Sequence, residues 1–169
     1  MKTRAKKALF LALILSTAFL TGCWNYRSLS DIDIVAGMAI DLDESGNGFM
    51  VTLEIVDLTR SNKDKGIKPV LVESQGTTIF EAIRNANKRI ESKPYFGATE
   101  LVVISQNVIQ KNGLLPILDW LMRDNEPRDI LLLAISQMPT AAEILKAQGV
   151  DQTVKSFEIR KIINNNTSV

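Results

Sequence analysis

The chain has 169 residues, of which 46% are apolar, enough for one domain with its own core. Twenty basic residues stand against nineteen acidic ones, so the chain lacks the basic excess that nucleic-acid binding normally needs. Histidine is absent, which excludes histidine-based zinc sites and every Ser-His or Cys-His nucleophile. The composition therefore predicts neither a nucleic-acid-binding protein nor a histidine-dependent enzyme.

The first 23 residues have the pattern of an export signal. Basic residues at 2–7 precede an apolar run of thirteen residues at 8–20, and Leu20-Thr21-Gly22-Cys23 closes the run. A helix needs about 20 residues to cross the hydrocarbon core, so this run is too short for a comfortable membrane span. The last four residues are similar to a bacterial lipobox. We predict a signal peptide over 1–22, cleaved between Gly22 and Cys23.

Cys23 is the only cysteine of the chain, so no intrachain disulfide can form. The lipobox pattern implies an S-diacylglycerol and an N-acyl group on this residue. Each buried CH2 contributes about 0.8 kcal/mol, and more than one acyl chain is needed for stable anchoring. Residues 23–31 are then a lipidated tether. Within it, the indole of Trp24 either rests at the level of the lipid headgroups or packs on the folded domain.

Three strands are predicted in the first half of the domain. They cover 32–42, 49–58 and 69–74, with a turn cluster at 43–48 and a polar loop at 59–68. Phe49, Val51, Leu53 and Ile55 alternate with Met50, Thr52 and Glu54, which predicts a hairpin with one buried face.

Helices and buried strands alternate in the second half. Thr78 and Glu81 have capping-box spacing, and Pro94 is expected to stop the helix that they open. Further elements are predicted as a strand at 101–104, helices at 105–111 and 114–123, a buried strand at 130–135, and a helix from Thr140, capped with Glu143, to Gly149. We predict an α+β fold over 32–149, with an N-terminal β-hairpin in a mixed sheet and three to four helices packed on it. Residues 150–169 are predicted to be a polar tail or linker.

Two polar clusters need an interpretation. Asp41, Asp43, Ser45 and Gly46 are similar to the start of a calcium loop, but the twelfth position is Thr52 and the flanks are strands. A hairpin turn is the better interpretation, and no metal or cofactor is expected. The cluster over 123–129 is either a solvated loop with internal ion pairs or a polar contact surface. Candidate partner-contact residues are Trp24, Arg27, Arg123, Asp124 and Arg128.

An ordered set of short segments is similar to one known family. The segments are Gly22-Cys23-Trp24-Asn25-Tyr26-Arg27, Gly37-Met38-Ala39-Ile40-Asp41, Tyr95-Phe96-Gly97, Leu101-Val102-Val103-Ile104-Ser105, Gly113 to Trp120, Arg123-Asp124 and Arg128. Together they resemble the Ger(x)C family of spore germination C-subunit lipoproteins. The chain departs from the family pattern at Asn25, Ser28 and Ala98, where Asp, Glu and His are common.

The resemblance implies a subunit of a spore germinant receptor with no known catalysis. Such a subunit is anchored by lipid on the outer face of the bacterial plasma membrane, the spore inner membrane, beside the integral A and B subunits of the receptor. Full members carry further α/β domains, so the chain corresponds to an N-terminal domain. A solute-binding lipoprotein of a transporter is the alternative, and a lipoprotein enzyme using Ser-Lys or carboxylate chemistry is the third hypothesis.

Overall fold

The computed structural model describes residues 32–56, 69–124, 126–127, 130–147 and 154–166, together with Arg4, Lys6, Lys7 and Phe10. Within these ranges, no helix has both the length and the apolar character needed to cross a membrane.

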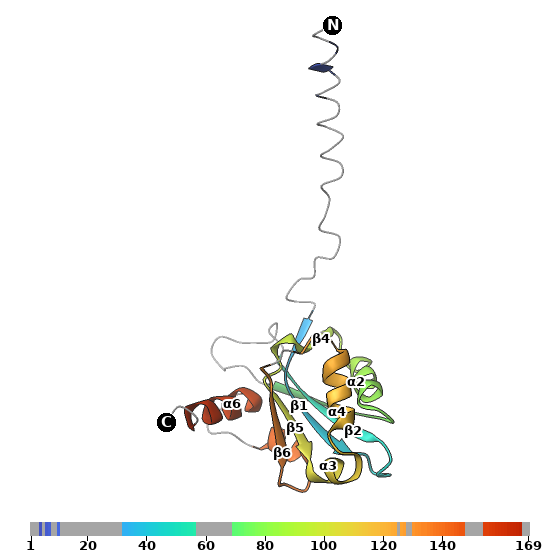
Figure 1. Ribbon diagram of the computed structural model, residues 1–169, viewed down its shortest axis with the longest axis vertical. Coiled ribbons are helices and arrows are strands. Elements are labelled where there is room, and N and C mark those ends of the chain that lie inside the picture. Colours follow the sequence, from blue (N-terminus) through green and yellow to red (C-terminus); the bar gives the residue numbers. More distant parts are fainter. Residues whose placement is uncertain are drawn as a thin grey trace.

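A mixed sheet of six strands forms the centre of the domain (Figure 1). Five strands lie in the order β3-β2-β1-β5-β6, and the short β4 pairs with the start of β1. The first three strands are antiparallel neighbours, whereas β4 and β5 run parallel to β1, and β6 runs parallel to β5. Their bounds are Ile32–Leu42 (β1), Phe49–Val56 (β2), Pro69–Gly76 (β3), Lys93–Tyr95 (β4), Leu101–Ser105 (β5) and Leu132–Ser136 (β6). The predicted α+β fold with an N-terminal hairpin is confirmed.

Helices lie on both faces of this sheet. Figure 1 shows α2 and α4 on one side of the sheet and α6 on the other. Residues of α2, α3 and α4 pack with the larger core cluster, and residues of α5 and α6 pack with a second cluster across the sheet. The helix bounds are Ile79–Asn87 (α2), Gln106–Asn112 (α3), Leu115–Arg123 (α4), Ala142–Lys146 (α5) and Lys155–Asn166 (α6), with a short 3-10 helix, η2, at Phe96–Ala98.

The larger core follows the period-two pattern of the strands. Val51, Leu53 and Ile55 of β2 face α2 and α4, as the alternation predicts. Trp120 of α4 is completely buried, and its ring meets Phe96 edge to face with a centroid separation of 5.8 Å. Such aromatic pairs add about 0.5–1.5 kcal/mol beyond the area that they bury. The pair fixes α4 against the segment that leads into β5.

The start of α2 has the predicted cap. The Thr78 hydroxyl accepts from the N–H of Glu81 at 3.1 Å. The Glu81 carboxylate accepts from the N–H and the hydroxyl of Thr77, and these two bonds hold the pKa of Glu81 below its usual 4.5. The end of α2 differs from the prediction: the helix stops at Asn87, and Pro94 lies within β4.

Both faces of the β1–β2 hairpin are buried, so the prediction of a single buried face is wrong. Thr52 and Glu54 are fully shielded from solvent on the face opposite the larger core. The start of α6 covers part of this face, although the sequence predicts residues 150–169 as a polar tail or linker. Residues 155–166 form a helix whose first N–H groups are satisfied by the buried carboxylate of Glu54.

The last strand also differs from the prediction of a buried strand. β6 forms the edge of the sheet, and its residues alternate between partly buried and exposed, with Ile135 55% exposed.

We predict that Gly37→Ala destabilises the domain by about 1–3 kcal/mol, as overpacking of a filled site does. A Cβ at Gly37 would lie 1.7 Å from Oγ and 2.8 Å from Cβ of Ser156, so the first turn of α6 would have to move. Denaturant unfolding measures the loss.

Ser156→Gly provides the matched variant, because it removes both clashing atoms. Added to Gly37→Ala, it should cost less than the sum of the two single changes. Strict additivity in this cycle would contradict the contact.

Candidate functional site

Glu54 of β2 is a charged residue with no exposure to solvent. Its carboxylate accepts from the N–H of Lys155 at 2.6 Å, from the N–H of Ser156 at 2.9 Å, and from the Ser156 hydroxyl. These two N–H groups belong to the first turn of α6, where the helix dipole favours a negative charge. A side chain from the middle of the sheet therefore caps a helix more than 100 residues later in the chain.

Asp41 of β1 does the same for α5. Its two carboxylate oxygens accept from the N–H of Ala141 at 2.7 Å and from the N–H of Ala142 at 3.0 Å. The side chain is 6% exposed. The expected cap, Thr140, makes no side-chain bond to the first turn of α5. We call Glu54 and Asp41 the carboxylate clamps.

The segment beside Asp41 forms the hairpin turn between β1 and β2. Asp43 accepts from the Ser45 hydroxyl at 2.8 Å, and its pKa is lowered, chiefly by a hydrogen bond from the backbone of Gly48. Gly46 has a positive φ of 72°, which the turn needs. Among the residues that the structure describes, no group of three or more possible ligands could hold a metal ion. Lys111 of α3 also donates to the Gly46 carbonyl and, at 3.3 Å, to the Asn47 side chain, so the turn is tied to α3.

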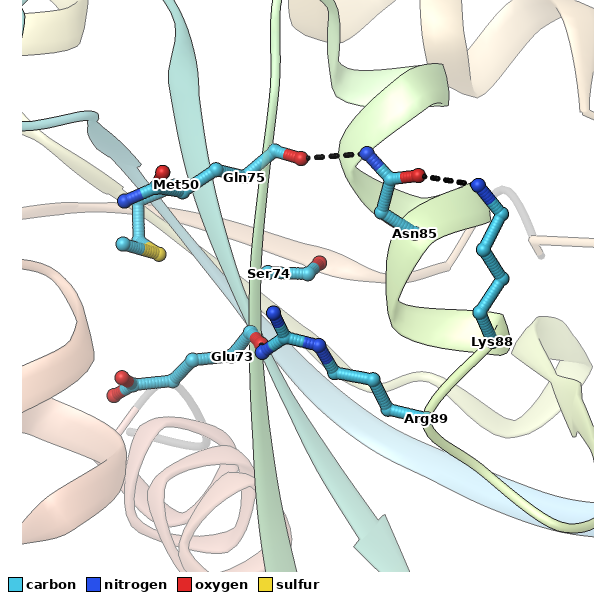
Figure 2. Close-up of a pocket in the computed structure, with 7 residues that line it drawn as sticks. All are labelled: Met50, Glu73, Ser74, Gln75, Asn85, Lys88 and Arg89. Atoms are coloured by element: carbon cyan, nitrogen blue, oxygen red, sulfur yellow. Dashed lines mark hydrogen bonds between the residues drawn. The ribbon is translucent and has the colours of Figure 1, made fainter.

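A pocket of about 460 Å³ lies between β3 and α2 (Figure 2). The side-chain amide of Asn85 donates to the Gln75 carbonyl at 2.8 Å, and the Arg89 guanidinium donates to the Glu73 carbonyl at 2.6 Å. Figure 2 shows the Glu73 carboxylate pointing away from Arg89, and it forms an ion pair with Lys146 of α5. β3 is an edge strand, so these bonds occupy carbonyls that the sheet leaves open.

The chemistry of this pocket does not indicate catalysis. Lys88 donates to the Asn85 side chain at 3.0 Å, and the Ser74 hydroxyl donates to the carbonyl of Ala82 at 2.6 Å. Both groups are therefore occupied by structural bonds. The cations of the pocket could contact an anion, but neither activates the serine.

The charged segment after α4 is largely tied into the domain. Arg123 forms an exposed ion pair with Asp119 at 2.7 Å, four residues earlier in α4. Asp124 accepts from the N–H of Glu126 at 3.1 Å. Glu126 in turn pairs with Lys93 at 2.5 Å, a contact between segments that the sequence pattern did not indicate. Of the predicted contact residues that the structure describes, Arg123 is the more available for a partner.

The other predicted site residues lie outside the described residues. These are Gly22, Cys23, Trp24, Arg27 and Arg128. Cleavage, lipidation and partner contact at these positions stay predictions.

The chain matches the family model "Spore germination protein N-terminal domain" over residues 25–169. The chain belongs to this spore germination family. Spore germination protein KC of Bacillus subtilis is 30% identical over 94% of the chain. Proteins B3 and A3 of the same organism are 24% and 25% identical over 76% and 72% of the chain. The chain covers 40% of KC and 33% of each of the other two, and no solved structure matches it.

The segments that carry the family resemblance have structural roles here. Gly37 and Asp41, the two ends of one motif, contact the starts of α6 and α5. Phe96 and Trp120 form the aromatic pair of the larger core. Glu54 escaped the sequence analysis because alternation in β2 placed it on a face expected to be solvated. On that face, Glu54 is followed by the apolar Val56. This mixture of polar and apolar residues is the signal that a second layer covers the face.

We predict that Glu54→Gln lowers the free energy of unfolding by about 2–3 kcal/mol, since a buried charge-assisted network loses one of its two acceptor oxygens and the charge. The amide can accept with one oxygen only, and its NH2 group would face a helix N–H. Denaturant unfolding measures the loss, and amide exchange should rise first at residues 155–158.

Glu73→Gln is the matched control, because it removes an exposed ion pair that contributes at most about 1 kcal/mol. Equal effects of the two substitutions would contradict the role given to Glu54.

Proposed function

We propose that this chain is a lipid-anchored, non-catalytic subunit of a spore germinant receptor. It is held by Cys23 on the outer face of the bacterial plasma membrane, the spore inner membrane. There it assembles with the integral A and B subunits into a receptor that senses nutrients and triggers germination.

The leader is the observation that carries this proposal. A basic start, an apolar run too short for a comfortable span and a lone cysteine after Leu20-Thr21-Gly22 occur together in a member of a spore germination family. Anchoring confines the domain to the membrane plane, which raises its effective concentration beside membrane partners.

The chemistry of the described residues supports a role without catalysis. Histidine is absent from the chain. The hydroxyls of Ser74, within β3, and Ser136, at the end of β6, donate to the carbonyls of Ala82 and Thr140. The buried carboxylates of Glu54 and Asp41 hold helices in place. These groups serve the fold.

Cys23→Ala should release the protein from the membrane fraction and impair germination in response to nutrient. The mass of the N-terminal peptide of the parent chain checks the chemistry directly, since it should show an acylated cysteine at the new N-terminus.

Ser28→Ala, a change of similar size in the tether, should leave both readouts unchanged. The anchor proposal fails if the Cys23→Ala protein stays with the membrane and spores carrying it germinate normally.

The pocket beside β3 gives the rival function a specific basis. Its volume of about 460 Å³ falls in the range of roughly 300–1,000 Å³ typical of small-molecule sites. Calorimetric titration of the chain with amino acids and sugars should show no saturable binding. Tight binding that disappears in Lys88→Ala would favour a solute-binding lipoprotein instead.

A further inference from the structure

Among the residues that the structure describes, no strand pairs with the outer edge of β6. Leu132 donates to the Glu100 carbonyl at 2.8 Å, and the parallel register places Leu132, Ala134 and Ser136 opposite residues of β5. In a parallel pair alternate residues bond to the neighbour, so Leu133 and Ile135 direct their N–H and C=O groups away from β5. These groups form a template on which another strand can pair.

At the opposite edge of the sheet, backbone carbonyls already accept hydrogen bonds from side chains. At β3, the side chains of Asn85 and Arg89 occupy the carbonyls of Gln75 and Glu73. An incoming strand would have to displace both bonds. Strand addition is therefore favoured at β6 over β3.

Exposed apolar side chains accompany the open edge. Leu133 and Ile135 are opposite Val102 and Ile104, which are completely buried on the face that α4 covers. Leu133 is nevertheless 39% exposed and Ile135 55% exposed, so this face of the sheet is covered at β5 but not at β6. Ile130 and Met138, at the two ends of the strand, are 66% and 50% exposed.

α4 adds a second row beside this strand. Its buried side carries Ile117 and Trp120, whereas Leu114, Leu118 and Met122 follow one another at intervals of four residues. α4 belongs to the connection from β5 to β6, and it packs on the face of the sheet that carries Leu133 and Ile135. The three side chains are 41–83% exposed, and Leu115 beside them is 75% exposed.

We call these eight exposed residues around β6 and α4 the β6 shelf. A large apolar side chain contributes up to about 100 Å² when fully exposed, so the shelf offers roughly 450 Å² of apolar surface. A standard interface buries about 800 Å² per partner, of which a little over half is apolar. One shelf therefore meets the apolar requirement of one side of a stable dimer, and it is comparable to the largest apolar patches of protein surfaces, which are often functional.

We propose that the β6 shelf binds a second copy of this chain, with the two β6 strands pairing antiparallel about a two-fold axis through Ala134. Leu133 of one copy then exchanges backbone bonds with Ile135 of its partner, and the sheet continues across the interface. The apolar stripes of the two α4 helices face each other over the paired strands. One patch thus serves both sides, as an isologous interface requires.

The symmetry also fixes the direction of the two tethers. Antiparallel pairing makes the two β1 strands run in opposite directions, so the chains enter the dimer from opposite ends. Residues 23–31 number nine and span at most about 30 Å. Both anchors reach one membrane when the strands lie along its surface.

Ala134→Cys tests the register in the full-length chain. Residues on the axis form a non-hydrogen-bonded pair with Cα atoms about 4.5 Å apart, close enough for a disulfide. Mild oxidation in detergent should give a covalent dimer on a non-reducing gel. Val70→Cys, an exposed position on the β3 edge, should crosslink no more than the parent chain, whose only cysteine is Cys23.

Sedimentation of the parent chain measures the association itself. The parent should sediment as a dimer, and Ile135→Lys should sediment as a monomer that still unfolds cooperatively, without the stabilisation that association gives the parent. Val70→Lys, on the other edge, should remain a dimer.

A monomeric parent chain, or a dimer that survives Ile135→Lys, overturns the proposal. Crosslinking of Ala134→Cys no greater than that of Val70→Cys overturns it as well. Membrane anchoring and germination are not read in these assays, so their outcome is separate from that of the proposed function.

Discussion

Glu54 carries a charge where there is no water to solvate it, and the second layer of the domain depends on how that charge is satisfied. An unpaired buried carboxylate would cost several kcal/mol, but Lys155 and Ser156 bring two helix N–H groups and a hydroxyl to it. The cost is offset only when α6 is seated on the sheet. Folding of residues 155–166 and burial of the second face of β2 are therefore one event.

Asp41 extends the same principle to α5, so each helix of the second layer is held by an acidic side chain from the sheet. Because Gly37 of β1 has no side chain, it leaves room for Ser156 of α6. Two of these three residues, Gly37 and Asp41, belong to a segment on which the sequence resemblance to the family rests. In this chain that segment attaches helices to the sheet.

The sequence predicted five of the six strands, the cap of α2 and the mixed sheet, because period-two alternation and turn residues are local signals, but it missed the short β4. It missed the burial of Glu54, since that depends on residues about 100 positions later in the chain. It also predicted a buried β6, because an apolar run does not show whether its last neighbour is solvent. For the candidate site, the leader pattern is visible in the sequence itself. The ion pair between Glu126 and Lys93 joins distant segments, so it could be found only from the fold.

Attachment of α6 by its first two turns has a mechanical consequence. Beyond Ser156, Ile159 still packs against the second cluster and Arg160 donates to the Ile130 carbonyl at 2.8 Å, whereas Ile162 is 51% exposed. A force applied to the end of α6 is therefore transmitted to Glu54 on β2, which lies between β1 and β3, and to the segment before β6. A sequence joined beyond this helix would be mechanically coupled to the sheet.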